Sequence, residues 1–427
     1  MEEQNRQDVF IARDTYLQKL IESKHNRLVK IICGIRRCGK SFLLFEIFKR
    51  HLLDQGVKPS HIIAVSLDTL GQERLCDPQQ YMQYITAHTK VAGMYYLFID
   101  EVQLMDKFVK VLNELLRNPN FDIYVTGSNS RFLSSDIVTE FRGRGDVIQL
   151  YPLSFAEFYA YQQGDRLQAL QDYGRYGGLP PILSFKSPER KREYLTNLFH
   201  VTYLRDVVER HHIQHEAELA ELITVIASGV GSLTNPTRLA DTFKGKKGVR
   251  LTAPTIAKYL AYFEDSFILH KALRFDVKGR KYINGPLKYY FSDVGLRNAR
   301  IGFRQKDPPH IMENIIYLEL RRRGYQVDVG VVGVFEKGKK GRYQKKDTEV
   351  DFVAQKGDEK IYIQSCYNLH DEEKEKQEKR SLLAINDVFK RVLIVNDTFF
   401  DKAYDEDGCL VMGLLEFLLN PHSLGEK

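Results

Sequence analysis

Gly34, Gly39, Lys40 and Ser41 have the types and spacing of a phosphate-binding loop, G-x-x-x-x-G-K-[ST]. An apolar run of strand type, residues 28–32, precedes the loop, and helix-forming residues follow it. In this setting successive backbone N–H groups turn toward a phosphate, and the helix dipole adds to the attraction. Lys40 is expected to reach the β- and γ-phosphates, and the Ser41 hydroxyl to hold Mg²⁺. The residues expected to contact the nucleotide are Gly34, Arg36, Arg37, Cys38, Gly39, Lys40, Ser41 and Phe42.

Residues 95–101 form a second informative run, because an apolar stretch of strand type ends there in two acids, Asp100 and Glu101. Such a strand is apolar because it is buried in a sheet, and its acidic end emerges beside the phosphates. Asp100 is expected to ligate Mg²⁺, directly or through water, and Glu101 to polarise the attacking water as general base. The alternative is a strand that ends in an ordinary charged turn.

The segments around these motifs alternate between strands and helices, which predicts an α/β fold with a doubly wound parallel sheet. The strand expected at residues 121–130 ends in small polar residues, and in such a sheet this end lies on the ligand side. Ser128 or Asn129 is therefore expected to sense the γ-phosphate. Further strands are expected at residues 61–68 and 146–153, and helices at residues 12–24 and 78–91.

The composition excludes several classes of protein. The 427 residues are 43% hydrophobic, so the chain can bury real cores, and its length suggests about three domains. No run approaches the roughly 18–20 apolar residues of a membrane span, and the first residues lack the features of a signal peptide. The five cysteines are scattered without a C-x-x-C pair, which favours reduced thiols and a cytoplasmic location.

Basic residues are concentrated in the second half of the chain, although the formal net charge is only +7. A basic half joined to a nucleotide-binding half suggests a polyanionic partner, most simply nucleic acid. For any single cluster, solvated loop charge is the alternative. The three clusters are Lys244, Lys246, Lys247 and Arg250; Arg274, Lys278, Arg280 and Lys281; and Arg321 to Arg323 with Lys337, Lys339, Lys340, Arg342, Lys345 and Lys346.

The phosphate loop, the Asp100-Glu101 strand end and Thr126-Gly127-Ser128 together resemble the AAA+ superfamily. Two further stretches, Arg142-Gly143-Arg144 with residues 151–158 and Gly177-Gly178-Leu179-Pro180, are similar to a broad family of bacterial and archaeal ATPases. In that family an AAA-type domain precedes a conserved region of unknown function. The resemblance covers essentially the whole chain and implies ATP and Mg²⁺ as cofactors.

The resemblance also implies that Arg144, with Arg142 as a second candidate, acts as an arginine finger. Such a finger stabilises charge on the transferring phosphoryl group, and a neighbouring subunit of a homo-oligomer can supply it. The alternative is an arginine paired with a nearby carboxylate.

Residues 215–307 have the pattern of a winged helix. Two helical stretches are followed by a third helix that opens at Thr252 with Pro254 in its first turn, a strong start signal. Strands at residues 271–275 and 288–291 flank a basic turn. In a helix-turn-helix variant of this kind the third helix can enter the major groove of DNA. Winged helices also dock onto proteins, and the apolar character of this helix keeps that alternative open.

Residues 308–427 are similar in order to the PD-(D/E)XK nuclease fold, with a helix, three strands, a charged helix and a strand. That chemistry needs acids on the first helix and the second strand, and E-x-K on the third strand, to hold Mg²⁺ and orient water. Glu313 and Asp351 match the two acids, but Gln364-Ser365-Cys366 stands where Glu-x-Lys is expected. Glutamine keeps an oxygen for weak ligation, whereas cysteine supplies no positive charge. The sequence therefore predicts a nuclease-like remnant with poor cleavage or none.

The sequence predicts four segments and leaves three functions open. The segments are an ATPase domain (1–160), a helical lid (161–214), a winged helix (215–307) and a nuclease-like domain (308–427). The leading hypothesis is a Mg²⁺-dependent ATPase that moves DNA- or partner-binding C-terminal domains. The others are an ATP-dependent nuclease and a nucleotide-gated signalling scaffold that binds proteins.

Overall fold

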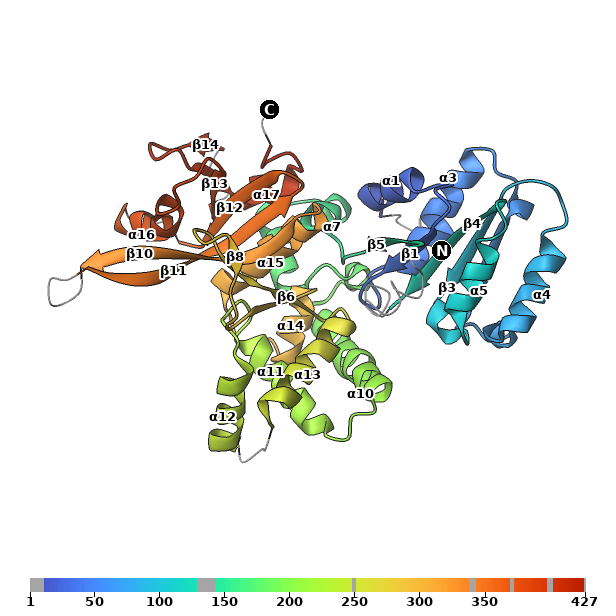
Figure 1. Ribbon diagram of the computed structural model, residues 1–427, viewed down its shortest axis with the longest axis horizontal. Helices are drawn as coiled ribbons and strands as arrows, with labels where there is room; N and C mark the ends of the chain where they lie inside the picture. The colour runs from blue at the N-terminus through green and yellow to red at the C-terminus, as the bar shows by residue number, and fades with distance from the viewer. Residues whose placement is uncertain are drawn as a thin grey trace, which may run out of the picture. The chain divides into compact units, whose positions relative to one another are not determined.

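The computed structural model describes residues 11–128, 143–247, 251–337, 343–368, 372–397 and 402–425, and Figure 1 labels its elements. The chain divides into two compact units, Met1–Pro152 with Asp265–Phe267, and Leu153–Glu264 with Ile268–Lys427. The expected division into four segments is finer than this and stays a prediction. Among the described residues, no helix combines the length and apolar character needed to cross a lipid bilayer.

The first unit is built on a five-stranded sheet in which every neighbouring pair of strands runs parallel. Its strands, in spatial order, are β2 (Ile62–Ser66), β3 (Tyr95–Asp100), β4 (Phe121–Gly127), β1 (Val29–Cys33) and β5 (Gly145–Gln149). The carboxyl ends of parallel strands meet at one edge of a sheet. The phosphate loop, the two acids and Ser128 therefore all follow strands at the same edge.

Alternate residues of these strands pack against helices on opposite faces of the sheet. On one face, Ile99 and Val125 belong to a buried cluster that includes residues of α4 and α5. On the other face, the rings of Phe98 and Tyr124 lie 5.8 and 4.8 Å from that of Phe48. Helices cover both faces, which confirms the doubly wound α/β fold. The helices of this unit are α1 (Asp14–Glu22), α2 (Lys40–Phe42), α3 (Lys49–Asp54), α4 (Pro78–His88) and α5 (Phe108–Leu115), with a π-helical segment, Leu43–Phe48, between α2 and α3.

The second unit contains an eight-stranded mixed sheet and a two-stranded antiparallel sheet. The large sheet has the order β14 (Ala403–Tyr404), β15 (Leu410–Gly413), β13 (Lys390–Val395), β12 (Glu359–Cys366), β11 (Tyr343–Lys356), β10 (Gln326–Lys337), β7 (Arg274–Asp276) and β8 (Lys281–Tyr282). The small sheet pairs β6 (Leu269–Ala272) with β9 (Lys288–Phe291). Within the large sheet, β10, β11 and β12 are antiparallel to one another in turn, and β12 and β13 are parallel.

Two helix starts in this part of the chain carry the caps that the sequence suggests. Ser154 and Glu157 form a complete capping box at the start of α7. The Thr252 hydroxyl accepts a hydrogen bond from the Thr255 N–H at 3.3 Å and so caps α13. The helices from residue 153 onward are α7 (Phe155–Gln162), α8 (Arg166–Tyr176), α9 (Pro188–Asn197), α10 (Arg205–His211), α11 (Glu216–Ser228), α12 (Pro236–Lys247), α13 (Ala253–Asp265), α14 (Val294–Arg300), α15 (Pro308–Arg322), α16 (Glu372–Leu383) and α17 (Leu414–Leu419).

The segment expected as one strand, residues 271–275, is split between the two sheets. Its first part belongs to β6, which pairs with β9, and its second part belongs to β7, which pairs in parallel with β10 of the large sheet. The basic turn after β7 is therefore attached to the large sheet, where the Lys278 ammonium donates to the Gly333 carbonyl at 2.7 Å. A sequence pattern cannot distinguish one long strand from two short ones that change partner.

Candidate nucleotide-binding site

The phosphate loop connects β1 to α2 and depends on two glycines. Gly39 has φ = 99°, a left-handed conformation that a side chain disfavours. Gly34 lies so close to the neighbouring segment that a Cβ atom would be 2.1 Å from the Leu150 carbonyl oxygen. The consensus glycines are therefore required by backbone conformation at one position and by close approach at the other.

Lys40 lies inside the loop and is only 5% exposed. Its ammonium group donates to the carbonyl oxygens of Gly34 at 3.0 Å and of Ile35 at 3.1 Å. The side chain therefore bends back over the loop that precedes it. In a phosphate-binding loop, the backbone N–H groups and the lysine ammonium together attract phosphate.

Ser41 and Asp100, from two different motifs, are in direct contact. The Ser41 hydroxyl donates to Asp100 Oδ1 at 2.9 Å, and the Ser66 hydroxyl at the end of β2 lies 3.3 Å from Asp100 Oδ2. The Thr126 hydroxyl on β4 also donates to Asp100 Oδ1. The two strands on either side of β3 and the loop helix thus place hydroxyl oxygens around the Asp100 carboxylate.

Burial raises the pKa of Asp100, and hydrogen bonds from Thr126 and Ser41 partly oppose that effect. A buried carboxylate of this kind is stabilised by a nearby cation. Hydroxyl and carboxylate oxygens are the ligands that Mg²⁺ prefers. The donor set of Ser41 and Asp100 therefore fits the expected Mg²⁺.

Glu101 follows Asp100 and adopts a left-handed backbone with φ = 50°, which is costly for a residue with a side chain. Its N–H donates to the Thr126 hydroxyl at 3.0 Å, which holds this conformation. Its carboxylate accepts hydrogen bonds from the Gln103 amide and, at 3.4 Å, from the Ser128 hydroxyl. The structure thus brings Glu101 and Ser128 together at the carboxyl edge of the sheet.

Three residues that contact these groups are absent from the sequence-based prediction. Thr126 and Ser66 lie at strand ends, and their contacts with Asp100 depend on a strand order that the sequence does not specify. Arg13 is buried before α1 and donates to the carbonyl oxygens of Cys38 at 3.3 Å and of Tyr151 at 2.6 Å. Its position before the first strand gives no local signal of a contact with the loop.

The structure does not bring Arg144 to the loop within one chain. Arg144 precedes β5, and β5 runs parallel to β1 with Gly145 beside Val29 at the opposite, amino-terminal edge of the sheet. Strands of five residues separate the two edges by roughly 16 Å. The Arg144 guanidinium instead donates to Asn113 Oδ1 at 3.1 Å. Asn129 and Arg142 lie outside the described residues, as do Lys339, Lys340 and Arg342 of the third basic cluster.

The three residues of the nuclease-like remnant do come together in the second unit. The Asp351 N–H donates to Gln364 Oε1 at 3.3 Å. Glu313 on α15 and Asp351 on β11 both face the ammonium group of Lys288, at 2.9 and 3.9 Å. Lys288 is a fourth member of this cluster that the sequence does not indicate.

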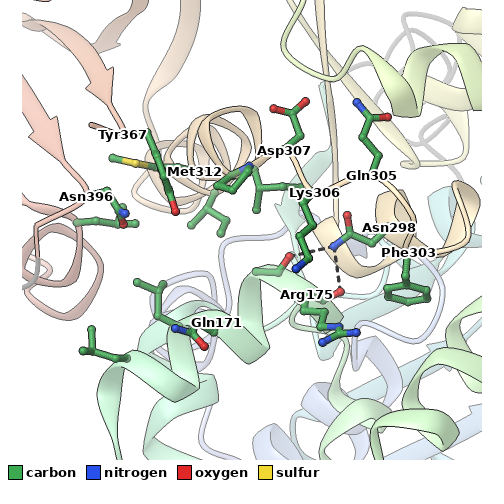
Figure 2. Close-up of a pocket in the computed structure, with 17 residues that line it drawn as sticks. Gln171, Arg175, Asn298, Phe303, Gln305, Lys306, Asp307, Met312, Tyr367 and Asn396 are labelled. Carbon is green, nitrogen blue, oxygen red and sulfur yellow. Dashed lines mark hydrogen bonds between the residues drawn. The ribbon is translucent and has the colours of Figure 1, made fainter. Parts of the chain in front are cut away.

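A cavity of about 450 Å³ is also present in the second unit. Figure 2 shows that its lining combines apolar and polar side chains, with Asn298 beside Arg175. The Asn298 amide donates to the carbonyl oxygens of Gly174 and Arg175, each at 3.0 Å, and so joins two parts of the wall. None of the residues that the sequence predicts for the nucleotide or nuclease-like sites lines this cavity.

Comparison with known proteins agrees with the phosphate loop and the parallel sheet of the first unit. Residues 26–159 match the family described as an AAA domain, and residues 167–307 match a domain of unknown function (DUF8612). An uncharacterised protein of Haemophilus influenzae is 33% identical over 422 residues, which cover 96% of this chain and 98% of that protein. The uncharacterised protein MJ1544 of Methanocaldococcus jannaschii is 29% identical, covering 93% of this chain and 88% of that protein.

One solved structure that the chain resembles is the Walker-type ATPase paby2304 of Pyrococcus abyssi. The identity is 16% and the TM-score 0.48, and the match covers 69% of this chain and 97% of that one.

The parallel sheet, the phosphate loop and the acidic strand end define the first unit as an AAA-type P-loop ATPase domain. The whole chain belongs to the family of AAA-domain proteins that includes the uncharacterised Haemophilus influenzae protein.

Proposed function

We propose that this protein binds ATP with Mg²⁺ and hydrolyses it, and that the nucleotide state controls a C-terminal half that binds DNA. The observation that carries the first part is the contact between Ser41 and Asp100, 2.9 Å apart, beside the buried Lys40. This contact joins the two residues expected to hold Mg²⁺. One of them belongs to the loop and the other to the acidic strand end.

Each residue has a distinct task in this proposal. The loop N–H groups and Lys40 bind the β- and γ-phosphates, and Ser41 and Asp100 hold the cation. Mg²⁺ bound there supplies positive charge to the phosphate oxygens. Glu101 takes a proton from the attacking water, while Ser128 and Gln103 orient its carboxylate. An arginine finger, Arg144, comes from a neighbouring subunit, because its own loop is too distant.

Two substitutions test ATP hydrolysis. Lys40→Ala is expected to remove ATP binding and turnover together, because it deletes the phosphate-binding ammonium. Glu101→Gln is expected to lower turnover by about 10²- to 10⁴-fold while ATP still binds, because it removes only the base. Steady-state phosphate release and equilibrium binding of a fluorescent ATP analogue measure the two effects.

Lys49→Ala on α3 and Glu114→Gln on α5 are the matched controls, because each changes the same residue type away from the loop. Both are expected to behave as the wild type. Full turnover in both Lys40→Ala and Glu101→Gln would overturn the ATPase proposal.

The arrangement after α10 supports the DNA-binding part of the proposal. Three helices, α11 to α13, are followed by the antiparallel β6–β9 pair, and an isolated bridge joins Thr234, between α11 and α12, to Leu287. This order of elements supports the proposal of a winged helix. Lys258 is exposed on the third helix, which supports its choice as a candidate phosphate contact.

A gel shift with duplex DNA across a salt series tests this part. Phosphate contacts release counterions, so the affinity must fall steeply as salt rises. Lys258→Ala is expected to reduce the salt slope by about one, whereas Lys90→Ala, in the ATPase domain, serves as the control. Salt-independent binding, or capture of a protein partner without DNA affinity, would favour the signalling scaffold instead.

A nuclease is the second candidate function, because Glu313 and Asp351 lie together as the two acids of the PD-(D/E)XK pattern do, with Gln364 beside Asp351 in place of the expected glutamate. The order α15, β10, β11, β12, α16 and β13 also supports this fold. Incubation of plasmid DNA with Mg²⁺ or Mn²⁺ decides the question. Cleavage that Asp351→Ala abolishes would establish the nuclease, and uncut plasmid would exclude it.

A further inference from the structure

Lys288 lies at the centre of the acidic cluster in the second unit. Its ammonium nitrogen is 2.6 Å from Glu349 Oε1, 2.9 Å from Glu313 Oε1 and 3.9 Å from Asp351 Oδ1. The lysine comes from β9, whereas the acids come from α15 and β11. One positive charge therefore faces three carboxylates that approach it from two other elements.

Lys288, Glu313 and Asp351 are largely removed from solvent, whereas Glu349 is half-buried. The side chain of Lys288 is 5% exposed, and those of Glu313 and Asp351 are 11% and 12% exposed. The Tyr290 hydroxyl donates to Glu313 Oε1 at 2.6 Å, and the Ser365 N–H donates to Asp351 Oδ2 at 2.9 Å. Buried carboxylates without a cation are costly, so an internal counter-charge is required.

The three carboxylates have the geometry of an acidic cation site. The cation in it is the ammonium group of Lys288, which is part of the chain itself. A divalent ion takes oxygen ligands at about 2.0–2.6 Å, and these acids instead surround an ammonium at hydrogen-bond distances. Within the part of the chain that the structure describes, no group of three or more His, Cys, Asp or Glu side chains is arranged to hold a metal ion. Gln364, in place of an acid, removes a further negative charge.

We propose that Lys288 is the resident cation of this cluster and takes the place of a divalent metal ion. The acidic site beside Lys288 is then closed to Mg²⁺ and Mn²⁺ in the native protein, which argues against the second candidate function, a nuclease. The ion pairs also join the β6–β9 pair to α15 and β11, so the residue that closes the site ties these elements together. This inference does not depend on ATP hydrolysis.

The decisive measurement is Mn²⁺ binding and Mn²⁺-dependent thermal unfolding of the full chain. Asp100→Asn is present in every sample, without nucleotide, so that the loop site does not contribute. In this background we expect the same melting temperature in EDTA and in millimolar MnCl₂, and no Mn²⁺ bound at the cluster. Adding Lys288→Met is expected to lower the melting temperature in EDTA, to restore part of it in MnCl₂, and to create one Mn²⁺ site by electron paramagnetic resonance.

Lys379→Met is the matched control, because Lys379 is likewise buried and paired with two acids, Glu375 and Asp405. It is expected to lose stability without a gain of Mn²⁺ binding. The double variant Lys288→Met with Glu349→Gln keeps Glu313 and Asp351 and removes the charge of the half-buried Glu349. It is used instead of Lys288→Met if the single variant does not fold.

Three results would overturn the proposal. The first is Mn²⁺ binding by the Asp100→Asn protein with Lys288 intact, if adding Asp351→Asn abolishes that binding. The site would then be open despite the lysine. The second is a folded Lys288→Met variant, or a folded double variant, that neither binds Mn²⁺ nor is stabilised by it. The third is an equal gain in Lys379→Met. The Asp351→Asn comparison needs no change at Lys288, so it gives a result even where the lysine variants do not fold.

Discussion

Asp293 accepts a hydrogen bond from the Gly178 N–H at 2.7 Å, although the two residues are 115 positions apart. The same carboxylate accepts a bond from the Leu296 N–H at 3.0 Å and so caps α14. The Gly177-Gly178 turn is thus tied to the start of a distant helix. The Gly178 carbonyl in turn accepts a bond from the Leu153 N–H at 2.8 Å, which continues the connection to the start of α7.

Gly178→Ala is expected to destabilise the protein by about 1–3 kcal/mol, because there is no room for a methyl group. A Cβ there would lie 2.4 Å from the Leu153 carbonyl oxygen and 2.9 Å from Tyr173 Cε2. Gly245→Ala is the control, since nothing lies within 4 Å of its Cβ position in α12, and it is expected to be neutral or stabilising by up to about 1 kcal/mol. Urea unfolding followed by circular dichroism measures both, because the chain has no tryptophan. Equal stability of the two variants would contradict the steric account.

Asp293 is expected to make the stability of the protein pH-dependent. Burial raises its pKa from 3.8 to about 6, while hydrogen bonds from Gly178 and Leu296 partly oppose the rise. The folded state therefore holds the proton more tightly than the unfolded chain. Its contribution to stability is fully present below about pH 4 and is lost as the pH rises toward 6.

Asp293→Asn removes this titration and also replaces an acceptor of the Gly178 N–H. We expect it to destabilise the protein, and the difference in unfolding free energy from the wild type to shrink between pH 4 and pH 6.5. Unfolding curves in urea at several pH values give this difference. Two parallel stability profiles would show that Asp293 does not titrate in that window.

The grouping of the candidate nucleotide-site residues at one edge of the sheet could be predicted from the sequence where these residues lie close together along the chain. The loop consensus specifies Gly34, Lys40 and Ser41, and the apolar run before Asp100 identifies a buried strand whose end faces the ligand. The alternation of strands and helices specifies the doubly wound sheet. These signals are local, because each lies within one short stretch of the chain.

Residues that act across the fold could not be predicted in the same way. Lys288 lies in a short strand, and nothing near it indicates that Glu313 and Glu349 will surround its ammonium. Lys30 interrupts an apolar strand without revealing that Asp122 is its partner on β4. Such contacts depend on strand order and register, which a single sequence does not specify.

The Lys30–Asp122 pair gives a prediction about buried charge. Both side chains are almost completely buried, and burial lowers the Lys30 pKa while Asp122 opposes that effect. Asp122→Asn leaves a buried ammonium without its counter-charge and is expected to cost about 3–5 kcal/mol. The double variant Lys30→Met with Asp122→Leu is expected to recover most of that loss.

The exposed pair of Arg117 and Glu114 is the control for this comparison. Their charged atoms are 2.7 Å apart in solvent, so Glu114→Gln is expected to cost less than about 1 kcal/mol. Thermal unfolding of the three variants measures the contrast. A double variant no more stable than Asp122→Asn would mean that the charge imbalance is not the cause.

Arg13 is expected to act as a positioning residue for the phosphate loop. Its guanidinium binds the Cys38 carbonyl, and that carbonyl and the Gly39 N–H belong to one planar peptide group. Holding the carbonyl therefore aims the N–H in the opposite direction, toward the phosphate cradle. Arg13→Ala is expected to weaken ATP binding by about tenfold, the equivalent of one charge-assisted hydrogen bond. Arg13→Lys, which keeps one donor, is expected to recover part of the affinity.

Separate measurements of KM and kcat distinguish a positioning role of Arg13 from a general loss of stability. Arg13→Ala is expected to raise KM and the nucleotide Kd while kcat changes little, because Glu101 and Asp100 are untouched. Gln18→Ala, exposed on α1 and bonded to Glu22, is the control and is expected to change neither constant. A fall in kcat with an unchanged Kd, or a melting temperature lowered so far that the protein is partly unfolded in the assay, would mean that Arg13 stabilises the domain and does not aim the loop.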